Sequence, residues 1–261
     1  MYTLAQNQLP SSVHATQAWE GVSSKYRFVS TANIVETFAK QGFFPVAARQ
    51  AGTRIESKQG YTKHMIRFRR ECDLNVSVGT AVPEIILVNS HNRGSSFQLN
   101  AGMFILACLN GLVIADKTFP ETFFRMRHVG DTEPIVLALE GIVSQFPRML
   151  AQVESMKAVI LPESVQLDFA RAALSLRWDT DKAPLNESSL NVGVGTAEHR
   201  DNSLWSTYQR IQSVLVGGRK SYYRSRFAPA TVRKISSVDQ DLRINKALWS
   251  MACRLQEVAG V

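Results

Sequence analysis

The residues best suited to chemistry lie near the C-terminal end, where arginines are interleaved with tyrosines. Segment 217–235 reads GGRKSYYRSRFAPATVRKI, and residues 202–238 contain no Asp or Glu, which gives that window a local charge of +7. Arg and Lys neutralise phosphates, and tyrosine rings stack on unpaired bases. We therefore predict that this segment forms a basic loop that binds single-stranded nucleic acid. Its predicted contact residues are Arg219, Lys220, Tyr222, Tyr223, Arg224 and Arg226.

A second basic window covers residues 42–70, where seven Lys and Arg residues face Glu56 alone. Lys63, Arg67 and Arg69 alternate along a predicted strand, so they share one of its faces. We predict that this face is exposed and that the opposite face is buried. The two windows carry +7 and +6, more than the net charge of +8, so the rest of the chain is acidic and we predict that the windows line one polyanion-binding groove. The alternative is two solvated faces with their counter-charges nearby.

The polar turn 89–96 suggests a hydrolase, because His91 lies beside Ser90 and close to two further serines. A serine nucleophile needs a base that a third group orients, and neighbours in sequence do not supply that geometry. The sequence also lacks a GxSxG elbow, the HxxxH, CxxC and HExxH spacings of zinc sites, and the GxxxxGK[ST] and GxGxxG loops of nucleotide sites. These observations favour a protein with no catalytic residues, no metal and no cofactor.

Two apolar runs, 85–88 and 103–114, flank the polar turn and predict a core on either side of it. Before them, a Ser-Thr cap and apolar residues at helical spacing predict a helix at 31–41. Strands are predicted at 43–54 and 62–72, with a turn between them. Further strands are expected at 84–89, from residue 96 onwards, and at 119–128.

The C-terminal half has the periodicity of helices. Apolar residues recur at helical spacing from residue 133 to 156, where Pro147 is expected to kink the helix or to split it in two. Helices are also predicted at 163–172, 204–216 and 239–258, whereas 179–202 is predicted to be an exposed loop.

These elements predict an α+β fold, in which a curved, mainly antiparallel sheet at 43–128 is packed by helices from the C-terminal half. Residues 1–23 are expected to form an N-terminal arm. Residues 24–261 are expected to form a single domain, with helix and sheet at 24–130 and mainly helices at 131–261. The sequence lacks the features of a signal peptide and an apolar run of about 18–20 residues, so we predict a cytoplasmic protein that contacts no membrane.

Several short motifs occur in order along the chain. They are Asn89-Ser90-His91, Gly94-Ser95, Cys108-Leu109-Asn110, His128 and LWSTYQRIQSVLVGGRK. Through them the chain resembles, over roughly residues 60–220, a family of phage/plasmid-like proteins with a domain of unknown function. That family tends to have His-Asp-Gly where this turn reads His-Asn-Arg-Gly. The resemblance implies the setting of a mobile genetic element and no particular activity.

The order of the elements is also similar to that of phage single-strand annealing proteins of the RecT and Redβ kind, which form rings or filaments with DNA in a basic groove. We therefore predict a nucleic-acid-binding protein of a phage or plasmid, in the host cytoplasm. It is expected to bind single-stranded DNA and to promote annealing and recombination as a homo-oligomer without ATP. Two alternatives stay open: an interaction protein that blocks a host defence, and a hydrolase that uses the Ser90–Ser96 turn.

Overall fold

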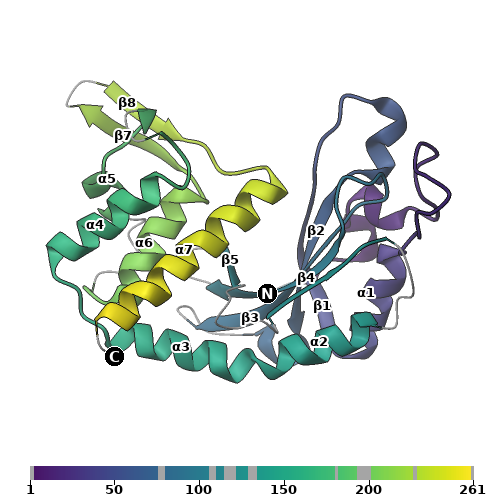
Figure 1. Cartoon of the computed structure of the whole chain (residues 1–261), viewed down its shortest axis with the longest axis horizontal. Coiled ribbons are helices and arrows are strands. Elements are labelled where there is room, and N and C mark those ends of the chain that lie inside the picture. Colours follow the sequence, from purple (N-terminus) through teal and green to yellow (C-terminus); the bar gives the residue numbers. More distant parts are fainter. Residues whose placement is uncertain are drawn as a thin grey trace. The chain divides into compact units, whose positions relative to one another are not determined.

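The computed structural model of the chain describes residues 3–75, 80–105, 110–114, 122–128, 134–179, 182–192, 201–225 and 228–259. For residues 110, 219–225 and 228–230 it describes the backbone alone. The chain divides into two compact units (Figure 1). Unit 1 comprises Met1–Ser77, Val82–Met103 and Val113–Phe146, and unit 2 comprises Val78–Ala81, Phe104–Leu112 and Pro147–Val261. The sequence predicts a single domain at residues 24–261, whereas in the structure these residues are distributed over the two units.

A six-stranded sheet lies mostly in unit 1. Its strands pair in the order β1-β2-β3-β4-β5, and β6 also pairs with β4. The pairs β1–β2, β2–β3 and β4–β6 are antiparallel. The predicted α+β class with a mainly antiparallel sheet is therefore confirmed. The strands are β1 (Phe43–Gln50), β2 (His64–Arg70), β3 (Ala81–Asn89), β4 (Phe97–Ile105), β5 (Asn110–Ile114) and β6 (Phe123–Met126).

Strand β2 is buried on both of its faces. It lies between β1 and β3, and every residue from His64 to Arg69 is buried. A strand in the middle of a sheet has no exposed side when both faces of the sheet are covered. The strand itself is confirmed, but the prediction that its basic face is exposed is wrong.

One helix, α1 (Thr31–Lys40), packs against β1 (Figure 1). The side chain of Ser30 caps its first turn, as the sequence predicts. Its buried face includes Phe38, whose ring packs edge-on against Phe68 with 5.0 Å between the ring centroids. The helix therefore closes one part of the core of unit 1.

The N-terminal residues also pack on unit 1. They form two short 3-10 turns, η1 (Gln6–Gln8) and η2 (Ser11–His14). The backbone N–H of Leu4 donates to the carbonyl of Pro45 in β1 at 2.7 Å, and Val13 is fully buried. This segment is irregular, and its apolar residues anchor it to the sheet.

The helices α2 (Pro134–Ser144) and α3 (Phe146–Ala158) follow one another and are separated at Gln145. Pro147 lies in the first turn of α3, where a backbone N–H has no partner within the helix and its absence costs little. The split is one of the two outcomes that the sequence predicts for Pro147, and the structure confirms it.

Unit 2 is built from helices and one β-hairpin. Every residue of α6 is buried, and Tyr208 in α6 packs edge-on against Trp249 in α7 with 5.9 Å between the ring centroids. The predicted helices at 163–172, 204–216 and 239–258 are confirmed as α4, α6 and α7. Within the described ranges, no helix has both the length and the apolar character needed to cross a bilayer. Besides α3, the elements are α4 (Glu163–Leu174), α5 (Glu187–Val192), α6 (Leu204–Leu215), β7 (Arg219–Ser225), β8 (Ala228–Val232) and α7 (Val238–Val258).

Two segments of unit 2 differ from their predictions. Region 179–202, predicted to be a loop, contains α5, because the side chain of Asn186 caps this helix and Leu190 is buried. Segment 217–235, also predicted to be a loop, forms the antiparallel hairpin β7–β8. Gly218, with a φ of 73°, turns the chain out of α6, and the aromatic and β-branched residues that follow favour strands.

Candidate functional site

Arg67 and Arg69, predicted to line an exposed groove, instead bind a buried carboxylate. Arg67 Nη1 lies 2.7 Å from Glu84 Oε2, and Arg69 Nε lies 2.7 Å from Glu84 Oε1. The side chain of Glu84 is fully buried, and those of Arg67 and Arg69 are 11% and 3% exposed. A carboxylate removed from water needs opposite charges close by, and β2 supplies both. The prediction that these two arginines face a ligand is corrected: they stabilise the sheet.

The other predicted contact residues are distributed over both units. Lys63 is half-buried in unit 1, just before β2. Arg219, Lys220, Tyr222, Tyr223 and Arg224 have their backbone in β7 of unit 2, and Arg226 lies outside the described residues. Because each unit is described by itself, the joint groove stays a prediction.

The polar turn after β3 is held by its own side chains. Ser90 Oγ accepts a hydrogen bond from Ser95 N at 2.7 Å and donates one to Ser95 O at 3.1 Å. Asn92 Oδ1 accepts from Gly94 N at 2.9 Å. Between them, Arg93 has a φ of 64°, in the left-handed region that costs a non-glycine residue roughly 1–2 kcal/mol. The turn therefore fixes an arginine in a strained backbone conformation.

Three other segments tie this turn in place. The Tyr26 hydroxyl donates to Ser90 O at 2.7 Å. Trp19 N donates to His91 O at 2.9 Å, and His91 N donates to Tyr61 O at 2.9 Å. The turn is therefore a rigid platform, because its backbone is bonded to segments distant in sequence.

A buried polar cluster adjoins the turn. His64 Nδ1 donates to Thr62 O at 3.1 Å, so its Nε2 accepts from the Thr31 hydroxyl at 2.8 Å. Thr31 Oγ1 in turn accepts from Asn89 Nδ2 at 3.0 Å and from His91 Nε2 at 3.3 Å. Burial lowers the pKa of His64 to about 4 and that of His91 to about 3. Both imidazoles are therefore neutral at pH 7.

This geometry does not support the hydrolase alternative. A hydrolase needs a serine whose hydroxyl faces a base oriented by a third group. Here the Ser90 hydroxyl bonds to the backbone of Ser95, and His91 Nε2 faces Thr31. Among the residues that the structure describes, no carboxylate bonds to His91.

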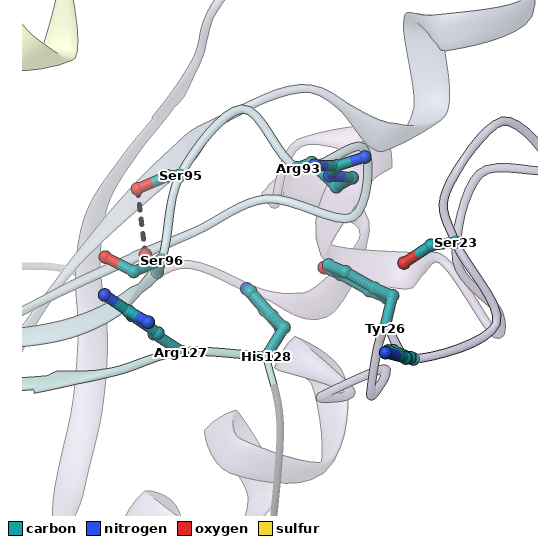
Figure 2. Close-up of a pocket in the computed structure, with 8 residues that line it drawn as sticks. Ser23, Tyr26, Arg93, Ser95, Ser96, Arg127 and His128 are labelled. Atoms are coloured by element: carbon teal, nitrogen blue, oxygen red, sulfur yellow. Dashed lines mark hydrogen bonds between the residues drawn. The ribbon is translucent and has the colours of Figure 1, made fainter.

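A pocket with a volume of about 300 Å³ opens beside the turn (Figure 2). Three segments of unit 1 form it: the residues before α1, the polar turn, and the end of β6. Lys25, Arg93 and Arg127 are exposed there and make no ion pair with any described residue. No Asp or Glu from the described ranges lines the pocket, which therefore suits an anion. Its lining residues are Ser23, Lys25, Tyr26, Arg93, Ser95, Ser96, Arg127 and His128.

Two aromatic rings form a fixed wall of this pocket. The rings of Tyr26 and His128 stack with 4.5 Å between their centroids and 20° between their planes. His128 Nδ1 donates to Arg27 O at 3.1 Å, and Arg27 N donates to His128 O at 2.7 Å. Burial lowers the pKa of His128, although the carbonyls of Arg27 and Ser95 oppose this effect.

The hydroxyl of Ser96 is an uncharged hydrogen-bonding group of the pocket. It accepts from Arg125 Nε at 2.8 Å and from Gln98 Nε2 at 3.4 Å. A hydroxyl that accepts from two donors still has its own proton to donate. Ser95 Oγ, in contrast, donates to Ser96 O at 2.8 Å (Figure 2). Ser96 is therefore the better placed of the two serines to donate to a ligand.

Sequence reasoning missed this pocket, although signals for parts of it were present. One was an arginine in the turn, where the resembled family tends to have an acid, and another was the RMRH run that ends at His128. The lining residues come from segments about 70 and 30 residues apart in the chain, and no local pattern joins such segments.

The chain is similar to two proteins of Escherichia coli (strain K12). It is 35% identical to UPF0380 protein YfjQ and 34% identical to UPF0380 protein YafZ, in each case over 244 residues that cover 92% of this chain and 86% of the relative. No solved structure matches the chain significantly. The similarity to single-strand annealing proteins therefore stays a prediction.

A family model described as "Domain of unknown function (DUF932)" matches residues 18–249. This match covers the helix and sheet of unit 1, including the whole pocket, and most of unit 2. It confirms the resemblance inferred from the motifs around the polar turn. The chain belongs to the DUF932 family, whose defining domain has no assigned function.

Proposed function

We propose that the protein binds nucleic acid, single-stranded DNA in the first place, during replication or recombination of a phage or plasmid. One observation carries the proposal: Lys25, Arg93 and Arg127 meet at a pocket that no described carboxylate neutralises. Cations held together without counter-charges attract a polyanion, and the fork of a guanidinium group fits two oxygens of a phosphate. The hydroxyl of Ser96 adds an uncharged donor of the kind found at phosphates.

The hairpin β7–β8 is the second proposed binding surface. It carries the arginines and tyrosines that the sequence predicts to bind nucleic acid, on a β-ribbon instead of a loop. Stacking of bases on tyrosine is tolerant of sequence, as expected of a protein that handles single strands. Binding through two surfaces fits the annealing of strands by a homo-oligomer without ATP, which we propose as the activity.

A binding titration across a salt series tests the proposal. A fluorescently labelled single-stranded oligonucleotide is expected to bind at low salt, with log Kd rising linearly with log salt concentration. Replacing both Arg93 and Arg127 by Gln should reduce this slope by about 0.7 for each phosphate that the variant no longer neutralises. Replacing Arg224 and Arg226 by Gln should weaken binding independently, because these residues belong to the second surface.

The matched control is Arg171→Gln. Arg171 is exposed on α4, where Asp168 and Glu187 already neutralise it at 2.9 and 3.0 Å. Its removal lowers the net charge by one but removes no free cation, so the affinity should hardly change. An absence of oligonucleotide binding at low salt, or an equal loss of affinity in the control, would reject the proposal. In that case a tight protein partner would favour the anti-defence alternative.

A further inference from the structure

We propose that the pocket holds the terminal phosphate monoester of a strand, so that the protein recognises strand ends in addition to the strand itself. This inference rests on the nucleic-acid binding proposed above and names the group that the pocket takes. Its basis is the size and the charge of the pocket, together with its fixed backbone and aromatic wall.

The size of the pocket fits a terminal phosphate. A volume of about 300 Å³ lies at the lower limit of typical ligand pockets, which is enough for a phosphate with part of its sugar. A terminal phosphate carries chain on one side only, so its three peripheral oxygens are free to face the lining residues.

The charge of the pocket also favours a terminal phosphate. A phosphate monoester carries a charge of roughly −1.5 to −2 at pH 7, whereas each internal phosphodiester carries about −1. Lys25, Arg93 and Arg127 come from three separate segments and line one pocket. Three cations around one site match a dianion better than a single negative charge.

Hydrogen bonds hold the backbone and the aromatic wall of the pocket in place. The backbone of Arg93 is held in a left-handed conformation by the hydrogen bonds within the polar turn, and its side chain lines the pocket. Tyr26 is fixed by its hydrogen bond to Ser90 O and by its stacking on His128. Strained residues that their surroundings hold in place are frequent at ligand sites, because the ordering cost is then met before binding.

The Ser96 hydroxyl completes the set of donors. Ser96 Oγ accepts hydrogen bonds from Arg125 and Gln98, so its own O–H can donate to a phosphate in the pocket. A phosphate in the pocket would therefore meet forked guanidinium groups, an ammonium group and a polarised hydroxyl. This combination matches the three peripheral oxygens of a monoester, over which its charge is delocalised.

Competition among strands of one sequence tests the inference. The four probes are a linear oligonucleotide with a 5′-phosphate, one with a 3′-phosphate, one with hydroxyls at both ends, and a circular single strand. We expect one of the phosphorylated strands to bind at least about tenfold more tightly than the unphosphorylated linear strand, the value for one charge-assisted hydrogen bond. Which end gives the effect identifies the end that the pocket takes.

The variants assign the effect to the pocket. Arg127→Gln is expected to abolish the preference for phosphorylated ends while weaker binding of all four strands continues, and Arg93→Gln should do the same. If Arg93→Gln fails to fold, Arg127→Gln decides alone, because Arg127 is exposed and lies outside the polar turn. Arg171→Gln should keep the preference.

The outcomes separate this inference from the proposed function. Equal, salt-dependent binding of all four strands would overturn the inference and leave nucleic-acid binding intact. An end preference that survives in Arg127→Gln and Arg93→Gln would also overturn it. Binding of none of the strands would reject both proposals.

Discussion

Arg93 occupies a backbone position that suits glycine or asparagine. Its φ of 64° lies in the left-handed region, and the side chains of Asn92 and Ser90 hold the turn around it. The Arg93 side chain is exposed and forms no ion pair with a described residue. Since neither burial nor pairing explains an arginine at this position, its value to the protein is expected in ligand binding.

We expect Arg93→Gly to separate stability from binding. Glycine removes the left-handed strain but increases the entropy of the unfolded chain, so the free energy of unfolding should change by less than about 1 kcal/mol. Oligonucleotide affinity should nevertheless fall, because the pocket then has one cation fewer. Urea denaturation and a binding titration measure the two effects.

The control is Arg93→Lys, which keeps both the charge and the strain and should retain part of the affinity. If Arg93→Gly lost more than about 2 kcal/mol of stability, Arg93 would instead be a structural residue.

At the scale of elements, two glycines with positive φ connect a helix to a strand. Gly42 follows α1 with a φ of 78°, and a Cβ there would meet nothing within 4 Å. Gly218 follows α6 with a φ of 73°, and a Cβ there would lie 2.4 Å from Lys234 N. Only at Gly218 do two backbone segments approach so closely that a side chain has no space.

Arg177 reinforces this junction between α6 and the hairpin. Its guanidinium donates to the carbonyls of Leu215, at the end of α6, and Arg233, just after β8. Burial lowers the pKa of Arg177. The base of the basic hairpin is therefore fixed both by close backbone packing and by a charged donor.

We expect Gly218→Ala to be much more destabilising than Gly42→Ala. Both variants place a Cβ on a left-handed residue, at roughly 1–2 kcal/mol, but only Gly218→Ala adds a clash with main-chain atoms that cannot rotate away. Urea denaturation gives the two free energies, and hydrogen exchange should show the loss of protection concentrated at the hairpin. Equal costs for the two variants would contradict this account of the junction.

At the scale of the whole molecule, the buried histidines that the structure describes all lie in unit 1. His64, His91 and His128 belong to unit 1, whereas the described residues of unit 2 contain no histidine. Burial lowers the pKa of each of the three. Protonation of these three histidines therefore acts on the stability of unit 1.

We expect acid to destabilise unit 1 selectively. The ordinary histidine pKa is about 6.5. Below that pH, His64 and His91 are therefore protonated in the unfolded chain but stay neutral in the folded protein. The free energy of unfolding of unit 1 therefore has its full value above about pH 6.5. It should fall as the pH drops, by on the order of 1.4 kcal/mol per histidine for each pH unit.

Hydrogen exchange at pH 7 and pH 5, corrected for intrinsic rates, measures this effect unit by unit. His91→Leu should flatten the pH dependence, whereas His14→Gln, at an exposed position, should leave it unchanged. An equal loss of protection in both units would contradict the prediction.

The sequence by itself determined most of the secondary structure. The cap at Ser30, the break at Pro147 and the apolar periodicity of α6 act within one or two turns of chain, so they could be recognised without the fold. The antiparallel sheet followed from alternation and turns in the same local way. The family could also be recognised, because each of its motifs is only a few residues long and they follow one another in a fixed order along the chain.

Only the tertiary structure decided which charges are available to a ligand. Alternation shows that Arg67 and Arg69 share a face of β2, but not that Glu84 on the next strand meets them inside the sheet. The pocket arises where the pairing of β6 with β4 and the bonds of Tyr26 to the polar turn bring three distant segments together. The physical reason is that burial and charge pairing depend on neighbours across the fold, and the local order of residues does not contain those neighbours.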